Sequence, residues 1–130
     1  MLSLQEARRL ADRALDRARD QRQKIAVAVL DELGELVQLD RMEGASPMAA
    51  DLAEAKARTA LNFQKPTAEL EREFADHPER REMFEKVARF TPVPLPGGLP
   101  ILRGGALVGA IGVCGADKDE DIAKAAITAP

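Results

Sequence analysis

Lys56 and Thr59 are the two side chains whose types and spacing most directly indicate a binding site. Residues three apart share one face of a helix, and Thr59 lies on an apolar face, so Lys56 would extend its ammonium group to the rim of a pocket. The Gly97–Gly98 loop would close over that rim, and its N–H groups together with Lys56 would bind an anion such as a carboxylate. The alternative is a surface ion pair of Lys56 with Asp51 or Glu54.

The single histidine and the single cysteine are the other candidates for chemistry. His77 stands beside Pro78 in a charged segment, where an exposed side chain is expected, and one histidine cannot form a multi-histidine metal site within one chain. Cys114 is either a thiolate nucleophile or soft ligand, or a small buried side chain, and the second interpretation is favoured. The acids between Asp117 and Asp121 fit the start of a helix better than a metal site, so no metal is expected.

The bulk composition is that of one acidic domain spanning residues 1–130. Apolar residues make up 45% of the chain, enough for one core, but aromatic residues only 3%. A net charge of −3, with basic and acidic residues interleaved, argues against nucleic acids and anionic membranes as partners. One cysteine excludes an intramolecular disulfide, and neither a signal peptide nor an apolar run of membrane-spanning length is recognised, so a cytoplasmic location is expected.

Hydrophobic periodicity predicts the elements that must position these side chains. A capping box of Ser3 and Glu6 begins an amphipathic helix that reaches about Gln21. There follow a hairpin of Lys24–Leu30 and Glu35–Arg41, a helix from Ser46–Pro47 to about Asn62, a short helix capped by Thr67, a charged segment Glu79–Arg89, a hairpin of Pro100–Arg103 and Ala106–Cys114, and a helix capped by Asp117 or Asp119. This order predicts an α+β domain in which helices cover an antiparallel sheet.

The segment from Thr91 to Gly115 combines prolines and glycines in an unusual way. Three alternating prolines remove backbone donors from Thr91–Gly98, which is therefore expected to be an ordered loop or edge segment. Seven glycines follow from Gly97 onward. We expect the stretch from Gly97 to Pro100 to form a pocket loop, and Gly109 and Gly112 to mark close backbone packing.

Six groups of residues, taken in order along nearly the whole chain, resemble one known family. They are Val29–Leu36, Arg41–Ala45, Ala55–Ala60, Lys65–Thr67, Gly97–Ile101, and Val108–Gly115 with the following Asp119–Ala123. The pattern is similar to that of the GlcG/HbpS family, which also includes the C-terminal domain of PduO-type proteins. The resemblance implies a fold with about five antiparallel strands flanked by helices, and homo-oligomers from dimers up to octamers.

The resemblance also implies ligands, since some members bind haem or iron and act in redox sensing or haem handling. Two features of this chain depart from the family pattern: Cys114 replaces a usual serine, and the segment Phe90–Pro96 is proline-rich and follows a charged helix. The first helix contains no histidine, so it offers no axial ligand. The candidate haem or redox ligands are therefore His77 and Cys114, followed by Met42 or Met48.

Three functions are compatible with these observations. The favoured one is an oligomeric small-molecule-binding protein, with haem or a related tetrapyrrole as ligand. The alternative is an enzyme or accessory factor of small-molecule catabolism, isomerase-like or lyase-like, in which Lys56 or Arg58 binds a carboxylate and Gly97–Gly98 forms an anion hole. The third is a structural oligomer whose glycines only permit close packing. For either binding function the predicted ligand-binding residues are Lys56, Arg58, Thr59, Gly97, Gly98 and Pro100.

Overall fold

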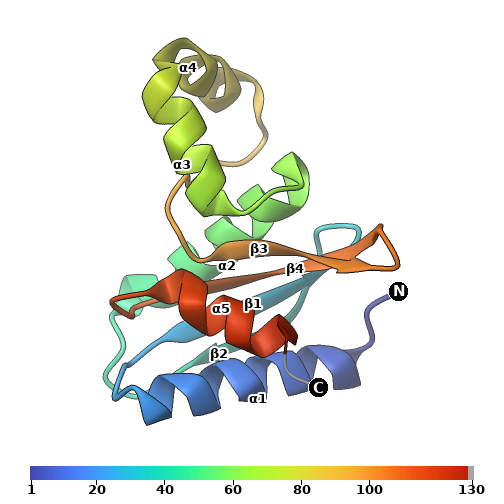
Figure 1. The fold of residues 1–130 in the computed structure, drawn as a ribbon, viewed down its shortest axis with the longest axis vertical. Helices are drawn as coiled ribbons and strands as arrows, with labels where there is room; N and C mark the ends of the chain where they lie inside the picture. The colour runs from blue at the N-terminus through green and yellow to red at the C-terminus, as the bar shows by residue number, and fades with distance from the viewer. Residues whose placement is uncertain (129–130) are drawn as a thin grey trace.

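The protein is described by a computed structural model that covers residues 1–128 (Figure 1). The elements are α1 (Leu4–Asp20), β1 (Ala26–Asp31), β2 (Leu36–Arg41), α2 (Pro47–Phe63), α3 (Thr67–Asp76), α4 (Pro78–Val87), β3 (Gly98–Arg103), β4 (Ala106–Cys114) and α5 (Asp119–Thr128). This is the predicted order of helix, hairpin, helices, hairpin and helix. The α+β fold expected from the sequence is confirmed.

The sheet is entirely antiparallel, with strand order β2-β1-β4-β3. The two hairpins meet where β1 pairs with β4, in a register that places Ala28 opposite Gly112. Residues 1–128 contain four strands, so the expectation of about five was one too many. Residues 91–97 form no strand, and Pro92, Pro94 and Pro96 lack the N–H groups that a strand partner would need.

The helices divide between the two faces of the sheet. On one face α1 and α5 lie side by side and close the larger core, which includes Leu10, Val27, Ile111 and Ile122. On the other face α2 lies across all four strands. Its approach is close because a Cβ atom on Gly112 would lie 1.9 Å from the carbonyl oxygen of Ala53. Small side chains therefore replace the missing aromatic bulk in this core.

Two helices, α3 and α4, extend away from the sheet (Figure 1). They are joined to the body by a cluster of Phe63, Phe74 and Phe84, whose ring centroids lie 4.9–6.0 Å apart. No residue of α4 is buried, and the side chain of Val87 is 74% exposed. No helix within residues 1–128 combines the length and apolar character needed to cross a membrane.

Candidate functional site

Lys56 is a buried cation that joins three elements. It is only 3% exposed, and its Nζ donates to the carbonyl oxygen of Val113 at 3.1 Å and to Oδ2 of Asp119 at 2.9 Å. The other carboxylate oxygen of Asp119 accepts from the N–H of Ala116 at 2.7 Å. Lys56 thus connects α2 to the end of β4 and to the start of α5. The alternative of a surface ion pair with Asp51 or Glu54 is wrong, because Lys56 is buried and its partner is Asp119.

Gly97 and Gly98 lie against Lys56, as the sequence predicted. The expected pocket loop over Gly97–Pro100 is wrong, however, because Gly98, Leu99 and Pro100 are the first residues of β3. A Cβ atom on Gly98 would lie 2.3 Å from the carbonyl oxygen of Lys56, so only glycine fits there. The N–H of Gly98 donates to Oγ1 of Thr67 at 2.9 Å, and the same hydroxyl donates to the carbonyl oxygen of Leu95. Thr67 was expected to cap α3, but Pro66 occupies the N-cap position and the threonine hydroxyl holds this loop instead.

The cavity beside Lys56 is acidic. It has a volume of about 460 Å³ and is lined by Lys56, Leu95, Pro96 and residues 117–121. Four carboxylates in that segment face two ammonium groups, those of Lys56 and Lys118. The field of this cavity therefore disfavours an anion. Carboxylate binding by Lys56 stays a prediction, and the alternative of an enzyme acting on a carboxylated metabolite gains no support from these surroundings.

Thr59 and Pro100 have structural contacts. The hydroxyl of Thr59, which is fully buried, donates to the carbonyl oxygen of Ala55 at 2.7 Å and accepts from the N–H of Val93 at 3.0 Å. Pro100 is half-buried in β3, opposite Ala110 of β4. Thr59 and Thr67 thus fasten the proline-rich segment to α2 and α3, and the segment in turn covers Lys56.

Arg58 lines a different cavity, which we call the turn pocket. This pocket has a volume of about 780 Å³ and lies between the β1–β2 turn, the C-terminal part of α2 and the segment that follows α4. Its apolar lining is Leu33, Leu61, Phe90 and Leu107, and its cations are Arg58 and Arg89. Arg58 donates to Oε1 of Glu54 at 3.2 Å and remains partly exposed.

Glu32 gives the turn pocket an unusual polar group. Its Oε2 atom is buried and has no hydrogen-bond partner within the described residues. A buried acceptor without a partner costs about 1–3 kcal/mol, so it is rare unless another molecule supplies a donor or a cation. Nothing in the sequence singled out Glu32, Arg89 and Phe90, because an acid in a polar turn and two residues after a charged helix carry no distinctive signal.

His77 and Cys114 lie apart from the turn pocket. His77 stands between α3 and α4, with its side chain 45% exposed and Nδ1 3.3 Å from the carboxylate of Glu79. Cys114 is half-buried at the end of β4. Burial raises the pKa of its thiol above the ordinary value, while the Lys56 ammonium partly lowers that pKa and the Asp119 carboxylate raises it. Cys114 is therefore a protonated thiol at neutral pH.

The two methionines named as further ligand candidates also lie outside the turn pocket. Met42 accepts a hydrogen bond at Sδ from the N–H of Ile25 at 3.4 Å, and Met48 is exposed at the start of α2. Within residues 1–128 no group of three or more His, Cys, Asp or Glu side chains is arranged to hold a metal ion.

The fold and its cavities define a class of α+β domain in which helices cover both faces of an antiparallel sheet and pockets open around its edges. Residues 2–128 match the model of the family described as haem degrading protein HbpS-like. The chain belongs to this HbpS-like family.

Relatives in sequence and in structure agree with this assignment. Protein GlcG of Escherichia coli strain K12 is 33% identical over 113 residues, which cover 87% of this chain and 81% of that protein. A crystal structure of a double mutant of Streptomyces reticuli HbpS has a TM-score of 0.86 and 33% identity, and the match covers 97% of this chain and 84% of that one. A PduOC:heme complex has a TM-score of 0.87 and 28% identity, covering 97% and 92% of the two chains.

Proposed function

We propose that this protein binds haem or a related tetrapyrrole in the turn pocket and acts as a homo-oligomer in the cytoplasm. The observation that carries the proposal is the turn pocket itself, where two arginines, an apolar lining and an unpartnered carboxylate oxygen meet. The HbpS-like family assignment and the structural similarity to a haem complex support the choice of ligand.

The residues of the turn pocket fit the chemical parts of haem. The macrocycle is a flat apolar plate, for which Leu33, Leu61 and Phe90 offer contact surface. Its two propionates are carboxylates, and the planar guanidinium groups of Arg58 and Arg89 suit carboxylates in bidentate geometry. A volume of about 780 Å³ lies within the usual range for ligand pockets.

Glu32 is the candidate iron ligand in this proposal. Its buried Oε2 atom lacks a donor, and a ferric ion would compensate an anionic oxygen there, as tyrosinate does in some haem proteins. When bound, the haem iron would supply one-electron and oxygen chemistry. The residues of the turn pocket would hold the macrocycle by apolar contact, neutralise the propionates with Arg58 and Arg89, and limit the access of water. His77 and Cys114 do not line the turn pocket and are not ligands in this proposal.

Titration with haemin, followed by the Soret band, tests the proposal. We expect saturable binding by the unaltered protein, and binding about tenfold weaker in Arg58→Gln and in Arg89→Gln, because each loses a charged hydrogen bond. Arg72→Gln is the matched control, since Arg72 is exposed and lies outside the pocket. Glu32→Gln keeps the side-chain shape and should change the Soret maximum and the electron paramagnetic resonance spectrum of the ferric complex.

Two results would count against the proposal. Haemin binding no tighter than to an unrelated acidic protein would remove haem as the ligand. Equal affinities for all the arginine variants would remove the turn pocket as the site. Size-exclusion chromatography with light scattering, with and without haemin, tests the oligomeric state separately.

A further inference from the structure

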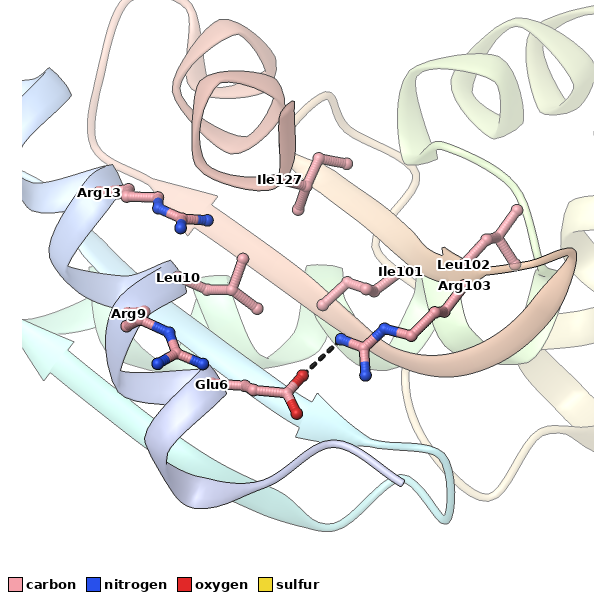
Figure 2. Close-up of a pocket in the computed structure, with 8 residues that line it drawn as sticks. All are labelled: Glu6, Arg9, Leu10, Arg13, Ile101, Leu102, Arg103 and Ile127. Atoms are coloured by element: carbon pink, nitrogen blue, oxygen red, sulfur yellow. Dashed lines mark hydrogen bonds and ion pairs between the residues drawn. The ribbon is translucent and has the colours of Figure 1, made fainter. Parts of the chain in front are cut away.

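A second amphipathic groove lies between α1, β3 and α5, on the sheet face opposite α2 and the turn pocket (Figure 2). It has a volume of about 430 Å³. Figure 2 shows that Arg9 and Arg13 extend from α1 and Arg103 from the end of β3, on opposite sides of an apolar floor. Three arginines and one glutamate line the groove, although the whole chain has a net charge of −3.

The glutamate of the groove is already paired. Glu6 forms an ion pair with Arg103, and the hydrogen bond from Arg103 holds the pKa of the Glu6 carboxyl below its usual range, so Glu6 stays ionised near neutral pH. Arg13 donates from Nη1 to the carbonyl oxygen of Ala126 at 3.3 Å. Arg9 forms no hydrogen bond or ion pair within residues 1–128, and its charge acts on the Glu6 carboxyl, whose pKa it also helps to lower. The groove therefore has three guanidinium groups for one carboxylate, and Arg9 is the guanidinium with no hydrogen bond within the described residues.

The floor of the groove is aliphatic. Leu10 and Ile101 form its buried part, Ile127 is half-buried beside them, and Leu102 is 60% exposed. An apolar chain lying over Leu102 would remove exposed aliphatic surface from water, which favours its binding. The floor contains no aromatic side chain, so it favours an aliphatic chain over a stacked ring.

We propose that this groove binds an aliphatic carboxylate. Arg9 holds the carboxylate, with help from the N–H groups of Arg103 that Glu6 does not use, and the chain lies over Leu10, Ile101 and Leu102. A guanidinium has five N–H donors, so Arg103 can serve both carboxylates. The site is distinct from the proposed haem site: the two share no residue, although Leu102 of the groove pairs with Leu107 of the turn pocket across the β3–β4 hairpin.

Calorimetric titration with submicellar sodium octanoate tests this site. We expect saturable binding that weakens with added salt, and about tenfold weaker binding in Arg9→Gln, the loss of one charged hydrogen bond. Arg9→Lys should recover part of the affinity. Arg8→Gln is the matched control, since Arg8 is an exposed arginine of the same helix that does not line the groove. Octanol, which has the same chain without the charge, should bind at least tenfold more weakly than octanoate.

Three results of these titrations would contradict the proposed carboxylate site. The proposal is overturned if the Arg9→Gln variant binds octanoate as tightly as the unaltered protein and circular dichroism shows that the variant is folded. Octanol binding as well as octanoate would overturn the carboxylate role, and no detectable octanoate binding would overturn the site. Arg58→Gln should leave octanoate binding unchanged, so failure here is distinguishable from failure of the haem proposal.

Discussion

Replacing Lys56 with methionine should destabilise the fold more than the same change at Lys65, Lys86 or Lys124, because those three lysines pair near the surface and Lys56 is buried. At an effective dielectric constant of about 20, two unit charges 2.9 Å apart attract by about 6 kcal/mol before desolvation is counted. The side chains of Lys56 and Asp119 are 4% and 13% exposed. Methionine fills similar space but leaves the Asp119 carboxylate and the Val113 carbonyl without their cation, which should cost about 3–5 kcal/mol of unfolding free energy.

Urea unfolding followed by far-ultraviolet circular dichroism measures this cost, and the absence of Trp and Tyr makes fluorescence unsuitable. The matched control is Lys86→Met, because Lys86 pairs with Glu82 on the surface with both side chains about 70% exposed. Lys86→Met should change the free energy of unfolding by no more than about 0.5 kcal/mol. If the free energy of unfolding of Lys56→Met falls by less than about 1 kcal/mol, the conclusion that Lys56 and Asp119 form a stabilising buried ion pair is refuted.

A double variant separates the charge from the packing. Asp119→Asn removes the carboxylate charge, while its amide oxygen can still accept from the N–H of Ala116. Lys56→Met combined with Asp119→Asn should therefore be more stable than Lys56→Met alone, because the uncompensated buried charge has gone. Simple addition of the two single costs would mean that the two side chains do not interact energetically.

Three further predictions concern the same region of the fold. Gly112→Ala would place a Cβ atom 1.9 Å from the carbonyl oxygen of Ala53 and force α2 away from the sheet, so thermal unfolding should show a loss of at least about 1–3 kcal/mol. Thr67→Val leaves the N–H of Gly98 without its acceptor and should cost about 2 kcal/mol in urea unfolding, whereas Thr67→Ser keeps the hydroxyl and should cost much less. Burial raises the pKa of Cys114, so its rate of alkylation by iodoacetamide should rise with pH to a midpoint above that of a free cysteine peptide, and a midpoint at or below that value would contradict the burial argument.

Local signals in the sequence were sufficient for the helices and strands. The hydroxyl of Ser3 accepts from the N–H of Glu6 at 3.1 Å, and the hydroxyl of Ser46 accepts from the N–H of Met48 at 3.3 Å, as the capping patterns predicted. These bonds join residues two or three apart, so the sequence contains all the information that they need. The close packing predicted at Gly112 is also confirmed, although its partner on α2 came only from the structure.

The candidate sites depended on contacts between distant parts of the chain. The sequence placed Gly97–Gly98 near Lys56 correctly, but it took Asp119 for a helix cap and missed its ion pair with the lysine. The turn pocket brings Glu32, Arg58 and Arg89 together from a turn, a helix and a loop. No spacing along the chain relates these three residues, because the pairing of β1 with β4 and the position of α2 across the sheet determine their distances.

The sequence by itself therefore determined the order and type of the elements, the acidic and aromatic-poor composition, and the resemblance to a family that the chain was then shown to belong to. Only the tertiary structure decided which charges are paired and which remain available: Lys56 is neutralised by Asp119, whereas Arg9 and the Oε2 atom of Glu32 lack hydrogen-bond partners within the described residues. The physical reason is that helix caps and turns are formed by residues that are neighbours in the chain. The burial and pairing of a charge depend instead on which residues from distant parts of the chain the fold places beside it.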